Sequence, residues 1–262
     1  MVTALLLLAA APRVLSADYC ADQIALALAD RAQIAALSVD AEKDFSYLRR
    51  RAEGLPQARA EAEEIVARGV DVVLRFWGGD AARHGRFADV VSLDYASDFD
   101  GVKANIKNAA AAIGQRARGE SLIEEIDDRL RALGEKGPSG TAALYVTPGG
   151  VTAGKGTMID AIFKAAGVRN IAADEGLAYW PPLSAEALLE NPPGFIVTGF
   201  FSADSERINH WSASRHPALK KALRATPRID LDADVLACPG WFSLDAAEKI
   251  RRAVDEGAPN RD

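Results

Sequence analysis

One segment has the residue types that bind phosphate in nucleotide-hydrolysing enzymes. Gly149–Lys155 follows a predicted strand and matches the spacing G-x-x-x-x-G-K of a phosphate-binding loop. That loop needs a hydroxyl directly after the lysine to bind Mg²⁺, but Gly156 stands there and Thr157 comes one position late. The segment also opens the second half of the chain, whereas nucleotide folds usually place this loop after their first strand. We therefore expect a tight glycine turn that lets the backbone approach a ligand or another strand.

The sequence patterns of metal and nucleophilic catalysis are missing. The histidines His84, His210 and His216 form neither H-x-x-x-H nor H-E-x-x-H, so we expect no dedicated metal site. No G-x-S-x-G turn supports acyl transfer. Cys20 opens a predicted helix, where a thiolate is stabilised, but no pattern supplies a histidine base for it. We expect a protein that is not an enzyme and has no cofactor, with a phosphate-binding α/β enzyme as the rival from another class.

Aromatic side chains gather where predicted strands pass into loops. In parallel sheets such loops form the ligand crevice, and bulky rings there suit a large, partly apolar ligand. The alternative is that each ring only packs the edge of the fold. The candidate ligand-binding residues at these positions are Tyr19, Trp77, Tyr95, Thr147, Tyr179, Trp180, Phe200, Phe201 and Trp241.

Arg75 ends a predicted strand close to Trp77 and is a further candidate for ligand binding. A guanidinium binds anionic groups well. Pairing with a nearby acid explains this arginine equally well, so both alternatives stay open.

The elements that must position these residues alternate along the chain. Strand-like apolar runs are separated by helical stretches, which favours the α/β class with parallel sheets and helices on both faces. The predicted strands are Arg13–Ser16, Ile34–Ser38, Val70–Phe76, Val90–Leu93, Thr141–Thr147, Asn170–Ala173, Phe195–Phe200 and Asp234–Ala237. The predicted helices are Ala21–Ala29, Gln57–Arg68, Gly156–Ala166, Ala185–Leu189, Ala218–Ala225 and Leu244–Asp255.

The centre of the chain breaks this alternation. From Asp98 to Leu133 there is no strand signal, and apolar residues recur at helical spacing. Gly114 and Gly119 allow a break between two helices, and the second helix would be about 28 Å long. We therefore predict an N-terminal lobe at residues 12–98, a helical connector at 99–140 and a C-terminal lobe at 141–262.

A short helix–turn–strand pattern occurs twice. Glu63–Leu74 and Glu186–Val197 each begin with an acid, continue with two aliphatic residues at the second and third steps, and end in an apolar strand. The offset is 186 − 63 = 123 residues, about half of the chain. A molecule of two similar halves usually has a cleft between them.

Composition describes a globular protein with no preference for nucleic acid. Apolar residues make up 49% and charged residues 26% of the 262 residues, and the net charge is −6, whereas nucleic acid rewards basic patches. Residues 1–11 are apolar but too short to span a bilayer, and they are typical of an export signal although no basic residue precedes them. A buried N-terminal strand is the alternative for this segment.

Several segments carry a family resemblance when they are taken together and in order. They are Pro12–Gln23, the two units beginning at Glu63 and Glu186, Gly150–Thr157, Ala166–Asn170, His216–Leu219 and Leu236–Gly240. With them the chain resembles the substrate-binding proteins of ABC importers for metal chelates. The resemblance covers nearly the whole chain, and it is specific for the family rather than for its ligand.

The resemblance implies two α/β lobes that are joined by a single long helix, with a ligand cleft between the lobes. It also implies that one acid on each lobe docks a permease in the membrane. Glu63 and Glu186 occupy these places, with Glu61 or Glu64 as substitutes on the first lobe.

Cys20 and Cys238 lie in segments that carry cysteine in some relatives, so the resemblance implies a disulfide between them. Two reduced thiols are the alternative. The chain departs from the family in Ala41–Pro56 and Phe200–Ser214, which match no part of it. In the family these loops border the cleft, so the departure concerns the ligand.

The resulting expectation is an exported, periplasmic and monomeric binding protein that delivers a metal chelate to a permease. A ferric siderophore is favoured because Arg75, Arg83 or Arg207 would offset an anionic chelate. Cobalamin or another corrinoid, which suits a ring-rich and weakly charged rim, is the second candidate. Haem is the third and needs an axial ligand such as Tyr19 or Tyr95.

Overall fold

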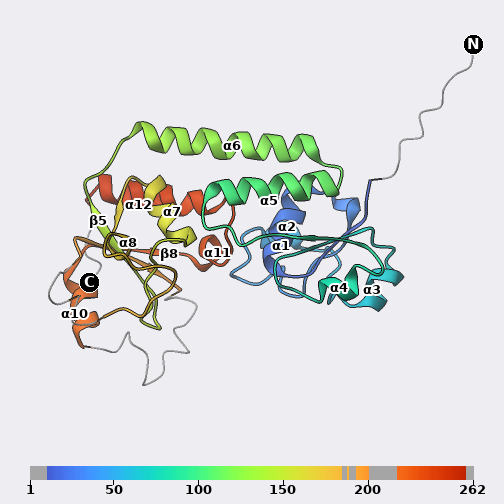
Figure 1. The fold of residues 1–262 in the computed structure, drawn as a ribbon, viewed down its shortest axis with the longest axis horizontal. Coiled ribbons are helices and arrows are strands. Elements are labelled where there is room, and N and C mark those ends of the chain that lie inside the picture. The colour runs from blue at the N-terminus through green and yellow to red at the C-terminus, as the bar shows by residue number, and fades with distance from the viewer. Residues whose placement is uncertain (1–10, 185–187, 189–192, 201–216, 258–262) are drawn as a thin grey trace, which may run out of the picture. The chain divides into compact units, whose positions relative to one another are not determined.

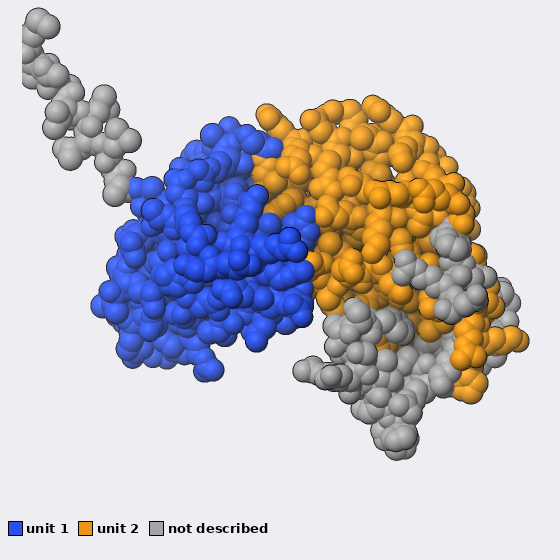
Figure 2. All heavy atoms as spheres, turned by 180° about the vertical axis from the view of Figure 1, so that it is seen from behind, with its two compact units in different colours: residues 1–94, 105–121 blue, residues 95–104, 122–262 orange. Residues whose placement is uncertain are grey.

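The computed structural model describes residues 11–184, 188, 193–200 and 217–257, and the chain forms two compact units. Unit 1 contains residues 1–94 and 105–121, and unit 2 contains residues 95–104 and 122–262 (Figure 2). Most of the predicted signal segment lies outside the described residues, and so do the predicted sites Glu186 and Phe201. The predicted domain limits and the predicted cleft stay predictions.

Unit 1 is built on a parallel sheet in the order β2-β1-β3-β4. Its strands are β1 (Val14–Ser16), β2 (Ile34–Ala36), β3 (Val72–Arg75) and β4 (Asp89–Ser92). The two central strands are short apolar runs because helices cover both faces of a parallel sheet. Strand β4 forms one edge and is only partly buried.

Short helices surround this sheet (Figure 1): α1 (Tyr19–Leu28), the 3-10 helix η1 (Arg31–Gln33), α2 (Arg49–Ala52), α3 (Ala62–Ala67) and α4 (Ala81–His84). Asp18 caps α1 because its side chain accepts a hydrogen bond from the amide of Ala21. Ile65 of α3 packs with Leu15 and Val73 in a buried apolar cluster. Because all four strands are parallel, their carboxyl ends lie at the same edge of the sheet.

Unit 2 repeats this plan with a parallel sheet in the order β6-β5-β7-β8. Its strands are β5 (Ala142–Val146), β6 (Arg169–Asn170), β7 (Phe195–Gly199) and β8 (Arg228–Leu231). The helices with described bounds after β5 are α7 (Met158–Ala165), α8 (Ile171–Asp174), α10 (Pro217–Ala225), α11 (Ala233–Leu236) and α12 (Ser243–Asp255). The α/β class with parallel sheets is therefore confirmed.

The two sheets also explain the duplicated sequence pattern. Strand β3 lies between β1 and the edge strand β4, and β7 lies in the same way between β5 and β8. The first copy of the pattern forms α3 and β3. The second copy ends in β7, and Leu188 within it is helical and buried. The two copies thus form equivalent parts of two similar sheets.

The central stretch forms two helices, α5 (Phe99–Ala112) and α6 (Arg116–Glu135), and α6 is the long helix of 20 residues. The break falls at Gly114, whose φ of +72° is a left-handed value that glycine adopts readily. The two helices lie side by side (Figure 1), and the ammonium of Lys103 on α5 is 2.9 Å from the Asp127 carboxylate on α6.

Two predicted strands are wrong. Asp234–Ala237 is mostly the helix α11, and the strand lies just before it as β8. Of Asn170–Ala173 only Asn170 belongs to a strand, because the next residues form α8. Short apolar runs fit either a strand or one helical turn, which is why periodicity misassigned them. No helix in the described part of the chain is long and apolar enough to cross a bilayer.

Candidate functional site

A pocket of about 280 Å³ lies at the carboxyl edge of the sheet in unit 1. The loops after β1, β2 and β3 and the segment before α3 supply its walls. The lining residues are Ala17, Asp18, Tyr19, Ser38, Val39, Asp40, Ala58, Arg59, Ala60, Glu61, Trp77, Gly78 and Gly79. This is the edge at which parallel sheets bind ligands.

Asp18 organises this pocket. Its buried carboxylate accepts hydrogen bonds from the amides of Phe76 at 2.7 Å, Trp77 at 3.1 Å and Gly78 at 2.9 Å with one oxygen, and from Ala21 at 3.0 Å with the other. A side chain at Gly78 would overlap the carbonyl of the residue before Asp18. One carboxylate therefore joins α1 to the loop that carries Trp77.

Three rings form a ladder beside this loop. The Tyr19 ring lies edge-on between Phe45 at 4.8 Å and Trp77 at 5.1 Å, measured between ring centroids. Trp77 is 51% exposed although it is large and apolar. Burial, followed by the charges of Asp18 and Asp40, raises the pKa of the Tyr19 phenol. The ladder therefore offers an aromatic surface with a neutral hydroxyl.

Arg75 stabilises the same loop. Its Nε donates to the Gly78 carbonyl at 2.8 Å, and its Nη2 donates to the carbonyls of Trp77 at 3.2 Å and Gly79 at 3.3 Å. Its Nη1 donates to the Ser92 hydroxyl at 3.3 Å. The guanidinium thus donates its hydrogen bonds mainly to loop carbonyls, and its binding of an anionic ligand stays a prediction.

A second buried acid lies behind the pocket. Asp22 of α1 is fully buried and accepts hydrogen bonds from the Ser38 amide at 2.9 Å and the Ser38 hydroxyl at 2.6 Å. Burial raises its pKa to about 6, and the charge of Asp18 adds to the rise, although the bonds from Ser38 and Ser16 oppose it. Because Ser38 lines the pocket, Asp22 fixes part of the pocket wall.

In unit 2, Tyr95 and Trp180 line an apolar pocket of about 130 Å³ together with α7 and α11. Trp180 packs edge-on against the buried ring of Tyr145 at 6.2 Å between centroids. Tyr179 is 67% exposed beside them. The structure therefore brings Tyr95 and Trp180 together in one unit, as it brings Tyr19 and Trp77 together in the other.

The other predicted ligand residues of unit 2 lie differently. Trp241 is buried and packs against Phe242 at 5.1 Å between ring centroids. The Thr147 hydroxyl donates to the Val151 carbonyl and accepts from the Val151 amide within its own turn. Phe200 directly follows β7 and has a φ of +63°. Buried packing and turn formation account for the first two residues, and their predicted ligand role stays a prediction.

The glycine-rich segment at residues 149–156 behaves as a turn. Its amides at Gly154 and Lys155 donate to the carbonyls of Tyr179 at 2.8 Å and Leu177 at 2.9 Å. The Thr157 hydroxyl donates to the Gly154 carbonyl at 2.8 Å and accepts from the Asp160 amide as the cap of α7. Amides that would cradle a phosphate are therefore already bonded, in agreement with the expected close backbone approach.

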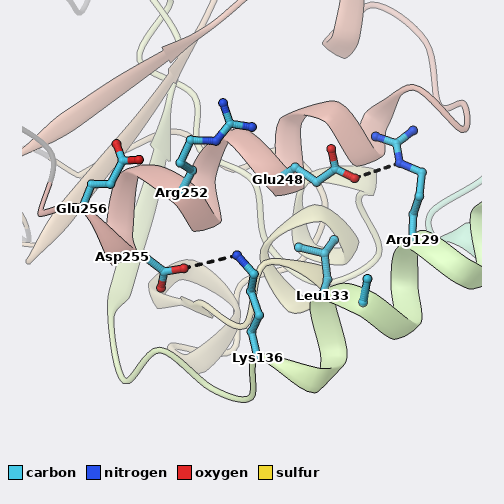
Figure 3. A pocket seen from close by; sticks show the side chains of 8 residues that line it. Arg129, Leu133, Lys136, Glu248, Arg252, Asp255 and Glu256 are labelled. Atoms are coloured by element: carbon cyan, nitrogen blue, oxygen red, sulfur yellow. Dashed lines mark hydrogen bonds and ion pairs between the residues drawn. The ribbon is translucent and has the colours of Figure 1, made fainter.

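A further groove of about 400 Å³ lies between α6 and α12 in unit 2 (Figure 3). Arg129 points to Glu248 at 2.8 Å, and Lys136 points to Asp255 at 3.4 Å. Hydrogen bonding from Arg251 lowers the pKa of the Asp255 carboxyl. The groove is lined by three basic and three acidic side chains, so its charges largely compensate each other and it is a weaker candidate.

The predicted docking acids are described only in part. Glu63 is exposed in the first turn of α3 and makes no ion pair with the described residues, whereas Glu61 pairs with Arg83 at 3.5 Å and Glu64 pairs with Arg68 at 2.6 Å.

Cys20 and Cys238 are both disulfide-bonded, which confirms the bond that the resemblance implies.

Within the described residues no group of histidine, cysteine and acidic side chains is arranged to hold a metal ion. The buried ring of His84 hydrogen-bonds through Nε2 to the Ala60 carbonyl at 2.6 Å.

Sequence reasoning missed Asp18, Ser38, Asp40 and Arg59 as pocket residues. Ser38 was hidden within a predicted strand and Arg59 within a predicted helix, but both belong to loops. Asp18 lies two residues after the first strand and directly before a helix, which is the signal that would have found it.

Comparison with known proteins supports one family. The family model described as "Periplasmic binding protein" matches residues 83–235. Two curated relatives, both named "Cobalamin-binding protein" and both from Halobacterium salinarum, are 34% identical over 114 residues, which cover 42% of this chain and 31% of each relative. The chain thus matches about a third of the length of these relatives.

Solved structures show the same fold at lower identity. The periplasmic heme-binding protein RhuT from Roseiflexus sp. RS-1 matches with a TM-score of 0.70 and 21% identity, over 95% of this chain and 100% of that chain. The periplasmic vitamin B12 binding protein BtuF of Vibrio cholerae matches with a TM-score of 0.67 and 20% identity, over 94% and 97%. Since the family model covers more than half of its residues, this chain belongs to the periplasmic binding protein family.

Proposed function

We propose that this chain is the solute-binding component of an ABC importer and that it captures a corrinoid such as cobalamin. The observation that carries this proposal is the ladder of Phe45, Tyr19 and Trp77 at a pocket whose walls carry little positive charge. The 34% identical relatives named as cobalamin-binding proteins support the same ligand class. A corrinoid presents a conjugated ring with amide side chains, which suits aromatic rings flanked by hydrogen-bond acceptors.

The charges of the pocket oppose an anionic siderophore. Its charged lining residues are Asp18, Asp40 and Glu61 against the single base Arg59. Of the arginines expected to offset an anionic chelate, Arg75 is bonded to loop carbonyls and Arg83 pairs with Glu61, while Arg207 lies outside the described residues. A ferric siderophore that carries negative charge would meet more acids than free bases here, so we place the corrinoid first.

Haem is supported less well than a corrinoid. A tyrosine that binds ferric haem does so as the phenolate, which a low pKa favours. Burial and the nearby Asp18 and Asp40 raise the pKa of Tyr19 instead. Tyr95, the other candidate, is 58% exposed in the other unit.

Titration calorimetry with cyanocobalamin and dicyanocobinamide tests the ligand. We expect Trp77→Ala to weaken corrinoid binding about tenfold, because an aromatic contact of this kind contributes about 1 kcal/mol or more. Phe87→Ala is the matched control, since Phe87 is a similarly exposed ring of unit 1 outside the pocket. Tight binding of a ferric hydroxamate with no corrinoid binding would overturn the corrinoid assignment.

The partner we propose is a membrane permease, and the location we propose is the periplasm after export. Glu63 is exposed and has no ion-pair partner among the described residues, which supports a docking role for the start of α3, and Glu186 stays the predicted acid of the other lobe. The rival hypothesis of a phosphate-binding enzyme predicts micromolar affinity for ATP, which Lys155→Ala would abolish. Calorimetry with ATP therefore decides between a binding protein and an enzyme.

A further inference from the structure

Tyr179 has a backbone conformation that its side chain does not favour. Its φ is +57°, in the left-handed region that suits glycine, and its ring is 67% exposed. No described ring packs against it, whereas the next residue, Trp180, packs on the buried Tyr145. Core packing therefore does not explain why a strained position carries a large exposed ring.

The glycine-rich segment at residues 149–156 holds this conformation. The Gly154 amide donates to the Tyr179 carbonyl at 2.8 Å, and the Tyr179 amide donates to the Lys155 carbonyl at 2.8 Å. A Cβ at Gly154 would overlap the carbonyl of Leu177, so the two segments approach this closely only because Gly154 has no side chain. The hydrogen bonds on both sides of Tyr179 fix its backbone.

The ring of Tyr179 lies beside the same segment. A Cβ built on Gly156 would lie 3.5 Å from Cε1 of Tyr179, so this edge of the ring lies beside bare backbone. Gly156 has a φ of +78°, which again favours glycine. The remainder of the ring is open to solvent in unit 2, so it is available to a flat partner.

We propose that the glycine-rich segment is a positioning device that holds Tyr179 in a strained conformation so that its ring stacks on the conjugated face of a planar ligand. Backbone strain persists where the surrounding structure fixes it, and it clusters at ligand-binding positions. The proposal rests on the proposed ligand-binding function and adds a specific residue to it. It also gives the segment that resembles a phosphate loop a role without phosphate.

Thermal unfolding tests the strain. Tyr179→Gly removes the side chain that disfavours φ of +57°, so we expect its Tm to rise by about 2 °C. Ala178→Gly is the matched control, because Ala178 is the exposed neighbour that pairs with Lys155 in a β-bridge and its φ is not positive. We expect the Tm of this variant to fall slightly, because glycine has more freedom in the unfolded chain. A fall in Tm for Tyr179→Gly like that of the control would overturn the strain argument.

Calorimetry with dicyanocobinamide and with haemin tests the ring. We expect Tyr179→Ala and Tyr179→Gly to bind dicyanocobinamide about tenfold more weakly, and Tyr179→Phe and Ala178→Gly to bind it normally. A gain in stability together with a loss of affinity is an outcome that a merely structural tyrosine would not give.

The failures of the two proposals are distinguishable. Unchanged affinity in Tyr179→Ala, with a tenfold loss in Trp77→Ala, overturns the role of Tyr179 and leaves the corrinoid function standing. If the wild type binds haemin and no corrinoid, the corrinoid assignment is overturned, and a tenfold loss of haemin affinity in Tyr179→Ala still supports the ring. A wild type that binds neither planar ligand overturns both proposals.

Discussion

At the scale of single residues, the buried carboxylate of Asp18 holds the pocket together through hydrogen bonds to four backbone amides. We expect Asp18→Ala to lower the free energy of unfolding by about 3 kcal/mol, because it leaves the partly buried amides of Phe76, Trp77 and Gly78 without their shared acceptor. Corrinoid affinity falls with it, since these amides fix the loop of Trp77. Urea unfolding and calorimetry measure the two effects.

Asp80→Ala is the matched control for Asp18. The Asp80 carboxylate also accepts from two amides, those of Ala82 and Arg83, as the cap of α4, but it is exposed. Losing an exposed cap costs about 1 kcal/mol and does not touch the pocket. If the two substitutions lowered the unfolding free energy equally, the hydrogen bonds of Asp18 would contribute no more to stability than an exposed helix cap.

Asp22 gives the protein a distinctive dependence of stability on pH. Its pKa is about 6 in the folded chain, against an ordinary value near 3.8, because burial disfavours the charged form. The folded state therefore binds the carboxyl proton more tightly than the unfolded state does, so the contribution of Asp22 to stability is complete below about pH 4 and is lost as pH rises through about 6. The loss is about 3 kcal/mol from the two-unit shift.

Asp22→Asn isolates this contribution, because the amide keeps the shape and does not titrate. We expect the difference in unfolding free energy between wild type and variant to fall as pH rises from about 4 through 6 and to level off near about pH 7. Urea unfolding at several pH values measures it. A difference that is flat across this range would mean that Asp22 titrates normally.

At the scale of elements, helix α6 carries two glycines with opposite surroundings. A Cβ at Gly119 would lie 2.5 Å from the Cβ of Ala110 on α5, whereas a Cβ at Gly134 meets nothing within 4 Å. We expect Gly134→Ala to stabilise the protein by about 0.5–1 kcal/mol through helix propensity. Gly119→Ala should destabilise it by about 1–3 kcal/mol, because the helices must move apart.

Thermal unfolding of these two variants tests whether α5 and α6 pack as described. Gly119 lies in the first turn of α6 and Gly134 in its last turn, and neither has a positive φ, so helix propensity favours alanine over glycine at both positions. A gain in stability for Gly119→Ala equal to that for Gly134→Ala would show that the contact between the helices is loose.

Among the elements, the long helices can be predicted from the sequence, whereas the short edge strand and the one-turn helix cannot. Helix α12 and the long α6 were predicted because their apolar residues recur at helical spacing over more than ten residues. Strand β8 was missed because Arg228–Leu231 alternates charged and apolar residues at a sheet edge. The apolar run just after it, in α11, gave a false strand signal because one helical turn is too short to show a period.

At the scale of the whole molecule, the duplicated pattern predicted more than any single motif. It located the equivalent strands β3 and β7 of two sheets with the same strand order. The pocket was predicted only through its rings, because the contacts that shape it join distant residues, as Asp18 joins the loop of Trp77. Hydrogen bonds between residues about 60 positions apart leave no local periodicity in the sequence.

The proposed delivery to a permease depends on the whole molecule, and Glu63 is where it is most directly tested. Of the acids at the start of α3, Glu61 and Glu64 already have basic partners, but Glu63 has none among the described residues. An unpaired exposed carboxylate is free to pair with a basic pocket on another protein. We expect Glu63→Ala to reduce corrinoid uptake into proteoliposomes that hold the cognate permease by about tenfold, with unchanged corrinoid affinity.

Glu64→Ala is the matched control on the same helix, because it breaks only the pair with Arg68 and such exposed pairs contribute about 0.5 kcal/mol. We expect normal uptake from it, and still lower uptake when Glu63→Ala is combined with Glu186→Ala. Loss of affinity in Glu63→Ala would place this acid at the ligand instead of at the permease. Normal uptake in the double variant would remove the docking role altogether, since charge pairing by one acid per lobe requires at least one of them.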